Sequence, residues 1–410
     1  MTPAPGRITV RPLTPDDDLE PDLELSHRAF GPFGAEARER RLASARLTVA
    51  AGAHLAAFDG GTQVASGRYL DLRQWWRGRV LPLAGVAGVK VAPHEQGRGL
   101  GRAVMTEMLQ QMAARGYPLS ALYPATVPLY RSLGWEMAGG LYVATIPARS
   151  LRALVPADPG SGPAAEPGPA TGGPVFRPAG PDDAAQMISV LSDLHAAGQD
   201  CGPVTFSPPF LAGVLGNPDV YAYLAPDGVL IYQWDTARDE MLLTCAAAGS
   251  AATGRALWAI VSSHGTIVKG IRAVVSPADP VSWLTREPDV TLTRAEMWML
   301  RLLDAPAAIA GRGFPPAVTL AAGLAVTDPQ LPANSGEWHL EISGGTAALT
   351  AARSPRPDSL RLGARGLAAL YAGTPLATLR RAGLAGGGTP AADAALNDAF
   401  AATPYMTDNF

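Results

Sequence analysis

A glycine-rich loop that joins a strand to a helix constrains this 410-residue chain more than any other feature. The strand Gly88–Val91 leads into Q-G-R-G-L-G at Gln96–Gly101, and apolar residues on one face predict a helix over Leu100–Arg115. Glycines let backbone N–H groups approach a ligand closely, and a helix N-terminus carries unpaired N–H groups and partial positive charge. The loop therefore favours an anionic ligand such as a pyrophosphate, with Arg98 and Arg102 as charged contacts.

Other glycine loops fit this segment less well. A Walker A loop is excluded because G-K-[ST] is absent. A Rossmann site is disfavoured because the glycines follow several loop residues and no acidic residue ends a second strand about 20 residues later. A turn that binds no ligand is the plainest alternative, but the order of strand, V-x-P, Q-x-x-G-x-G and amphipathic helix favours a ligand site.

The chain also contains a repeat. Its start and the segment after Val175 both run strand, R-P, a turn with paired aspartates, then helix, which indicates a duplicated unit of about 150 residues. A Pro/Gly/Ala-rich stretch at 156–174 separates the two copies and reads as a linker. In the second copy Met241–Ala247 is the equivalent strand, but Q-x-x-G-x-G is absent after it. We interpret the second copy as degenerate and structural.

Local patterns predict the elements around the loop. Asp16–Ala29 is predicted to be a helix capped by Thr14, and Gly88 is predicted to mark a bulge in the strand Val80–Val91. A third region is expected to begin with the strand M-W-M-L-R-L-L-D at Met297. Three helices are expected near its end: Gly366–Ala372, Pro375–Ala382 and Pro390–Ala401.

Composition excludes several classes of protein. With 33 basic and 36 acidic residues, the net charge of -3 argues against nucleic-acid binding. No apolar run of about 18 residues and no signal peptide are visible, so no membrane association is expected. Two cysteines, Cys201 and Cys245, suit a reducing compartment, which we take to be the cytoplasm. The six histidines are scattered and form no zinc motif, so no metal is expected.

The loop resembles the diagnostic stretch of the GNAT superfamily of acyl-CoA N-acyltransferases, through V-A-P-H-E-Q-G-R-G-L-G. The resemblance implies acetyl-CoA as co-substrate, with its pyrophosphate on the loop and its pantetheine along the strand before it. The implied cofactor-binding residues are Val89, Lys90, Val91, Gln96, Gly97, Arg98, Gly99, Leu100, Gly101 and Arg102.

A second motif follows about thirty residues later. Val127–Trp135 resembles the family's F-Y-x-x-x-G-F segment, which implies that Tyr130 protonates the leaving thiolate and that Ala125 and Thr126 touch the pantetheine. A phenol pKa near 10 and a thiol pKa near 8.5 allow this proton transfer near neutrality. The alternative is that Tyr130 only packs against the neighbouring helix.

The whole chain resembles the enhanced intracellular survival (Eis) family, through Leu70–Gly85, the segment that starts at Met297 and the aromatic C-terminus. The implied fold is α/β (α+β): two tandem GNAT-like domains, the second degenerate, and a sterol-carrier-like α+β domain. The expected boundaries are 1–150, a linker at 151–174, 175–296 and 297–410. Eis relatives are hexamers, so a homo-oligomer is implied.

In the Eis family the free carboxylate of a terminal phenylalanine acts as the base, which gives Phe410 that role here. The implied activity is acetyl transfer to a primary amine, first of an aminoglycoside-like small molecule and second of a protein or peptide lysine. Two departures weaken the aminoglycoside assignment: Pro32 lies in a loop without an acid, and Asn409 stands where an acid is common. The alternative from another class is a non-catalytic scaffold that binds CoA or a lipid.

Overall fold

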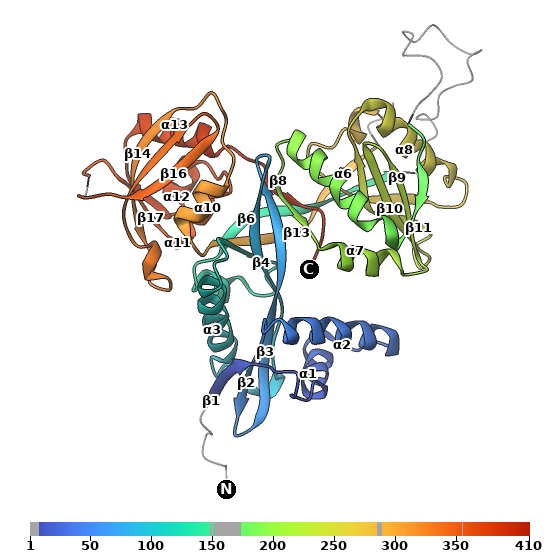
Figure 1. Cartoon of the computed structure of the whole chain (residues 1–410), viewed down its shortest axis with the longest axis horizontal. Helices are drawn as coiled ribbons and strands as arrows, with labels where there is room; N and C mark the ends of the chain where they lie inside the picture. The colour runs from blue at the N-terminus through green and yellow to red at the C-terminus, as the bar shows by residue number, and fades with distance from the viewer. Residues whose placement is uncertain (1–7, 148–149, 151–173, 285–288, 355) are drawn as a thin grey trace.

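The computed structural model describes residues 8–147, 150, 174–284, 289–354 and 356–410. The predicted linker lies outside the described residues except for Pro174. In Figure 1 the first unit lies at the bottom in blue, the second at the upper right in green and yellow, and the third at the upper left in orange and red. Within the described parts of the chain, no helix is long and apolar enough to cross a bilayer.

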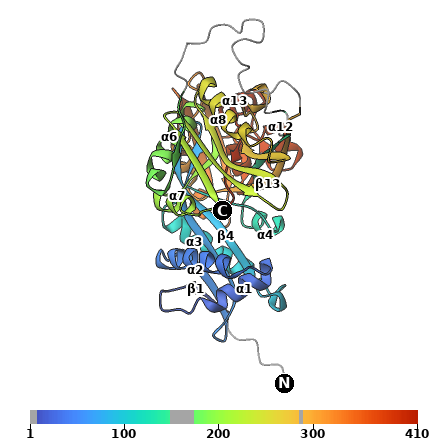
Figure 2. The same ribbon diagram turned by 90° about the vertical axis from the view of Figure 1, so that its right-hand side faces the viewer.

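The first unit is a twisted sheet with helices on both faces (Figures 1 and 2). The helix after the glycine loop buries the predicted apolar face, because Val104, Met105 and Met108 are fully inaccessible. The elements are β1 (Ile8–Pro12), α1 (Glu20–Phe30), α2 (Ala35–Ala50), β2 (His54–Asp59), β3 (Thr62–Trp76), β4 (Arg79–Val91), the 3-10 helix η1 (Pro93–Glu95), α3 (Leu100–Ala114), β5 (Leu119–Leu122), α4 (Val127–Arg131) and β6 (Glu136–Pro147).

Helix α1 differs from its prediction. It begins at Glu20 rather than Asp16, because Asp17 is held in the preceding turn. The Asp17 carboxylate accepts hydrogen bonds from the backbone N–H of Thr14 (2.7 Å) and from the Arg11 guanidinium (2.6 and 2.8 Å). Helix α2 was not predicted, because it buries only Ala45, Thr48 and Val49 and so has little apolar periodicity.

The second unit repeats this start in detail. Arg177 binds the Asp183 carboxylate at 2.7 Å as Arg11 binds Asp17, and the backbone N–H of Gly180 donates to Asp183 as that of Thr14 donates to Asp17. The two copies therefore share the contact as well as the sequence. The elements are β7 (Arg177–Ala179), η3 (Pro181–Asp183), α6 (Ala184–Ala197), β8 (Cys201–Thr205), α7 (Pro208–Leu215), β9 (Val220–Ala225), β10 (Gly228–Asp235), β11 (Glu240–Ala248), α8 (Ala251–Ser263), β12 (Gly270–Val275) and α9 (Val281–Leu284).

One long strand, β13 (Thr291–Leu302), joins the units. It lies between β5 and β6 and pairs antiparallel with both, while β6 also pairs with β12 of the second unit. The segment at Met297 that we expected to open the third region is therefore part of the shared sheet. The strand order is β1-β2-β3-β4-β5-β13-β6-β12-β11-β10-β9-β7, so the two units form one continuous surface.

The third unit is a separate five-stranded sheet covered by helices. The predicted terminal helices are present, and Thr389 caps the last one by accepting a hydrogen bond from the backbone N–H of Ala392 (3.2 Å). The elements are α10 (Ala305–Gly311), β14 (Leu320–Thr327), η4 (Pro332–Asn334), β15 (Gly336–Ser343), β16 (Thr346–Ala351), β17 (Leu360–Gly363), α11 (Ala364–Tyr371), α12 (Leu376–Arg381), β18 (Ala385–Gly387), α13 (Pro390–Phe400) and β19 (Tyr405–Met406), which leaves this unit and pairs with β6.

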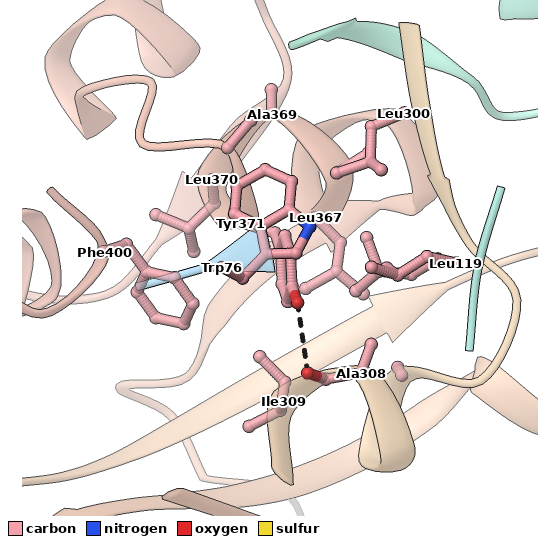
Figure 3. Close-up of a cluster of buried hydrophobic side chains, with 14 of the residues drawn as sticks. Trp76, Leu119, Leu300, Ala308, Ile309, Leu367, Ala369, Leu370, Tyr371 and Phe400 are labelled. Atoms are coloured by element: carbon pink, nitrogen blue, oxygen red, sulfur yellow. Dashed lines mark hydrogen bonds between the residues drawn. The ribbon is translucent and has the colours of Figure 1, made fainter. Parts of the chain in front are cut away.

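The tip of the β3–β4 hairpin is embedded in the core of the third unit. Trp76 is fully buried there, 4.8 Å from the Tyr371 ring between centroids, and Figure 3 shows it among Leu370, Leu367 and Phe400. A buried tryptophan contributes several kcal/mol to a core. The third unit therefore anchors the start of β4, and the glycine loop follows the other end of this strand.

Candidate active site

Strands β4 and β5 separate at the expected place. They pair only along Leu83–Val86, opposite Leu119–Leu122. Just beyond, Gly88 adopts a positive φ of 61°, and the register between β3 and β4 slips. This confirms the predicted bulge. It leaves the β4 edge at Val89–Val91 without a β5 partner, so an extended ligand can pair with it.

The glycine loop ends at an open helix N-terminus. Gly97 and Gly99 have φ values of +83° and +78°, which favour glycine, and a Cβ at either would meet no atom within 4 Å. The first intrahelical hydrogen bond runs from Ala103 N to Gly99 O (3.0 Å), and no side chain caps the helix. The backbone amides of Leu100–Arg102 therefore point outward with the positive end of the helix dipole.

The basic side chains of the loop have different roles. Arg98 forms ion pairs with Glu95 and with Asp59 (2.7 Å), so it holds the loop against β2. Arg102 is exposed and makes no hydrogen bond or ion pair with any described residue, so it is the cation available to an anionic ligand. Leu100 contributes only its backbone, because its side chain is buried.

Lys90 points away from the loop into a buried polar cluster. Its ammonium lies 2.9 Å from the Asp22 carboxylate, which also accepts hydrogen bonds from Ser66 (2.5 Å) and Gln63 (3.0 Å). Burial alone would raise the pKa of Asp22, but hydrogen bonding from His54 and the charge of Lys90 outweigh it and lower the pKa. Lys90 can therefore serve a ligand on β4 only through its backbone.

Asp22 was not identified from the sequence. The signal that could have found it is an acidic residue among the buried positions of α1, next to Leu23 and Leu25. Its contacts tie α1 to β3 and β4 behind the open strand edge. The cluster fixes the backbone of β4 where it leaves β5.

Tyr130 lies in α4, after β5. Its side chain is 4% exposed, and burial raises its pKa to about 12. The phenol is therefore protonated at neutral pH. Ala125 and Thr126 are exposed and lie directly before the first residue of α4.

The last residues of the chain are built into the sheet. Tyr405–Met406 pairs in parallel with Gly140–Leu141 of β6, and a Cβ at Gly139 would meet Pro404 O at 2.2 Å. A Cβ at Gly202 would likewise meet Tyr405 O at 2.3 Å. These two glycines let the backbone of the segment 404–406 insert between β6 and β8.

Phe410 lies beside the point where β4 leaves β5. Its ring is 2.8 Å from the place that a Cβ on Gly85 would take, and it packs edge-on against Tyr123 with centroids 5.7 Å apart. The Tyr123 hydroxyl donates to the backbone oxygen of Asp408 (2.8 Å). Phe410 is far from the first unit in the sequence, and the fold brings it to this unit, which contains Tyr130.

Glu296 is a second residue that sequence reasoning missed. It lies on β13, and its two carboxylate oxygens accept from the Asn409 side-chain amide at 3.0 Å each. The Asn409 position thus recruits a carboxylate from another strand. Only the pairing of β13 between β5 and β6 brings Glu296 to the chain end, so no local pattern could have found it.

Comparisons with known proteins agree with this geometry. An acetyltransferase (GNAT) domain model matches residues 9–138, a second matches 216–302, and a sterol carrier protein domain model matches 305–407. A crystal structure of a GCN5-related N-acetyltransferase from Kribbella flavida is 40% identical, covers 98% of both chains and superposes with a TM-score of 0.90. The chain therefore belongs to the GCN5-related N-acetyltransferase (GNAT) family, with two such domains and a sterol-carrier-like third.

Within that family the chain is of the Eis type. The N-acetyltransferase Eis of Mycobacterium tuberculosis is 29% identical over 308 residues, which are 71% of each chain. The crystal structure of Eis1 from Mycobacterium abscessus has the same fold, at 23% identity over 98% of this chain and 100% of that one, with a TM-score of 0.75. The chain is thus an acetyl-CoA-dependent acetyltransferase, and the scaffold alternative is not needed to explain it.

Proposed function

We propose that this enzyme acetylates a primary amine, with aminoglycoside-like small molecules as the first class of acceptor and protein or peptide lysines as the second. The position of Phe410 against Gly85 carries the proposal, because it brings the chain end to the opening between β4 and β5. The Glu296 carboxylate beside Asn409 supplies negative charge there for a protonated amine.

The residues of the first unit fit acetyl-CoA. Gly97 and Gly99 leave room at the loop, the amides of Leu100–Arg102 face outward, and Arg102 is uncommitted. These groups would hold the pyrophosphate, with Gln96 and Gly101 completing the loop. The free edge at Val89–Val91 would pair with the pantetheine amides, and Ala125 and Thr126 would bound it from the other side.

The chemistry then needs two proton transfers. The neutral amine attacks the thioester carbonyl, a C–N bond forms and the C–S bond breaks. Tyr130 gives its proton to the departing thiolate; burial raises its pKa to about 12, so the phenol carries the proton to be given at neutral pH. Phe410, through its α-carboxylate, orients the amine and takes its excess proton directly or through water.

An amine panel tests the proposed substrate class. Purified protein is incubated with acetyl-CoA and each amine, free thiol is measured, and products are identified by mass. We expect acetylated small polyamines with one or more added acetyl groups. Thiol release with peptide lysines alone would move the acceptor to the second class. Acetyl-CoA binding without acetylation of any amine would overturn the proposal.

Two further expectations do not rest on the geometry of the site. A hexamer is proposed from the resemblance to Eis, and size-exclusion chromatography with light scattering measures it. A reducing compartment such as the cytoplasm stays a prediction from Cys201 and Cys245, both of which carry free thiols.

A further inference from the structure

A large cavity lies in the second unit. It has a volume of about 740 Å³ and is lined by residues of α6, α7, α8, the strands β11 and β12 and the C-terminal segment. Protein interiors are packed densely, with few voids larger than a water molecule. A volume of this size is typical of small-molecule sites, which usually measure roughly 300–1,000 Å³.

The cavity occupies the same place as the acetyl-CoA opening of the first unit. Strands β11 and β12 pair in parallel only along Glu240–Leu243, opposite Gly270–Ala273, just as β4 and β5 pair over four residues. Beyond that point β11 continues through Thr244–Ala248, and these residues line the cavity. The duplication has therefore kept the opening between the two strands.

The N-terminus of α8, which corresponds to that of α3, cannot hold a pyrophosphate in the same way. Ser250 caps α8 by accepting a hydrogen bond from the backbone N–H of Thr253 (3.1 Å), so one of the amides at the entrance is already paired. The Thr253 hydroxyl donates to the Asp227 carboxylate (2.5 Å), which places a negative charge at the helix N-terminus. A phosphate would meet an occupied amide and a like charge.

The lining of the cavity has an apolar part and an acidic part. The apolar part includes Leu191, Phe206, Phe210 and Trp258, whose side chains suit an aliphatic chain. The acidic part carries three carboxylates, from Asp200, Asp279 and Asp408, and the described lining contains no lysine or arginine.

The acidic groups line the cavity from three parts of the chain. Asp200 follows α6 and binds His195 of that helix at 2.8 Å, Asp279 precedes α9, and Asp408 belongs to the C-terminal segment. Burial raises the pKa of Asp279 and of Asp408 to about 6. Each is therefore mostly ionised at pH 7.5, and a cation placed beside them would be stabilised.

We propose that this cavity binds a hydrophobic amine, with its aliphatic chain among the apolar side chains and its protonated nitrogen at the carboxylates of Asp279 and Asp408. The amine class follows from charge complementarity, and the aliphatic body follows from the apolar lining. The cavity lies at the opening of the second unit, and the proposal does not depend on the acceptor assigned above.

Calorimetry with N,N-dimethyldecylamine tests the proposal on the full chain at pH 7.5, below the micelle concentration. A tertiary amine forms no stable amide, so turnover does not interfere. We expect one molecule to bind per chain, at least about tenfold more tightly than 1-decanol, with decanoate weaker still. Equal affinity for the amine and the alcohol would show a mere apolar void and overturn the proposal.

Two variants locate the bound amine. Cys245→Phe fills the cavity and should weaken amine binding at least about tenfold, with the KM for acetyl-CoA unchanged. Asp279→Asn keeps the shape and should weaken binding of the amine about tenfold but not that of 1-decanol. Saturating CoA should not compete with the amine. Unchanged amine binding in the folded Asp279→Asn variant, or competition by CoA, would place the amine elsewhere and overturn the proposal.

Discussion

The two GNAT units of this chain share a strand opening but differ at the helix that faces it. In the first unit α3 begins after Gly99, with no side-chain cap, outward amides and the uncommitted Arg102 nearby. In the second unit Ser250 caps α8, and the carboxylate of Asp227 lies at its start through Thr253. The same fold thus has an uncapped, positive helix N-terminus in one copy and a capped helix N-terminus beside a carboxylate in the other.

This difference shows that the fold supplies an opening and that a few side chains decide what enters it. The two units also differ at the fourth residue of the short helix that follows β5 in the first unit and β12 in the second. This residue is Tyr130 in α4 and Leu284 in α9. The first unit therefore combines an anion site with a proton donor, and the second has neither.

The largest effect should come from closing the anion site. Gly99→Glu puts a negative charge and a strained positive φ at the loop, so acetyl-CoA affinity should fall at least about 10³-fold. A Cβ at Gly99 meets no atom within 4 Å, so the fold should survive. Calorimetry measures the affinity. The matched change Ala251→Glu at the start of α8 should leave acetyl-CoA affinity unchanged. An equal loss of affinity in both variants would mean that the N-termini of α3 and α8 do not differ in their role.

The next effect concerns the proton donor. Tyr130→Phe keeps the buried ring and removes the hydroxyl, so kcat should fall about 10²-fold with little change in the KM for acetyl-CoA. Steady-state kinetics with thiol detection measures both constants. Leu284→Ala in the second unit is the control and should leave kcat unchanged. An unaltered kcat in Tyr130→Phe would remove the phenol from the mechanism.

The chain end should have a smaller effect. One glycine appended after Phe410 moves the carboxylate without disturbing the pairing of β19, so kcat should fall about tenfold or more at an unchanged melting temperature. Kinetics and thermal unfolding on the same preparation check this. A Phe410→Leu variant, which retains a terminal carboxylate, should lose less activity than the extended chain. Full activity in the extended chain would reduce this segment to packing.

The smallest expected effect is on the free energy of unfolding, and it concerns Asp279 in the cavity of the second unit. Burial raises the pKa of Asp279 to about 6, above its ordinary value, so the folded chain favours the protonated carboxyl. The stability from that proton is complete below about pH 4 and is lost as the pH rises to about 6. Asp279→Asn should therefore stabilise the protein by about 1–2 kcal/mol at pH 7.5.

Urea unfolding at two pH values measures this. The gain should disappear near pH 3, where the wild-type carboxyl is mostly protonated in both the folded and the unfolded state. The Asn side-chain oxygen can still accept from the backbone N–H of Val281, which holds Asp279 at 2.9 Å. A gain that is the same at both pH values would mean that ionisation of Asp279 is not its cause.

Much of the first unit could be predicted because its signals are local. The apolar face of α3 and the bulge at Gly88 both follow from neighbours in the sequence. The start of α1 could not, because Asp17 binds Arg11 instead of entering the helix. Helix α2 was missed because it buries too few side chains to leave a pattern.

The site likewise has one part that local sequence predicts and another that depends on long-range contacts. The loop at Gln96–Gly101 is read from consecutive residues, since glycine spacing and a helix start determine its chemistry. The contact of Asp22 with Lys90 joins residues that lie 68 positions apart, and that of Glu296 with Asn409 joins residues 113 positions apart. Such contacts depend on which strands become neighbours, and no window of the sequence contains that information.

The sequence by itself determined the family, the duplication and the anion-binding loop, because each is written in short-range residue order. Only the tertiary structure decided that β13 would join the two units, that the chain end would lie at Gly85, and that the second copy would keep a cavity lined by three carboxylates. The physical reason is that packing selects among many compatible strand neighbours, and the selection minimises the free energy of the whole chain rather than of any segment.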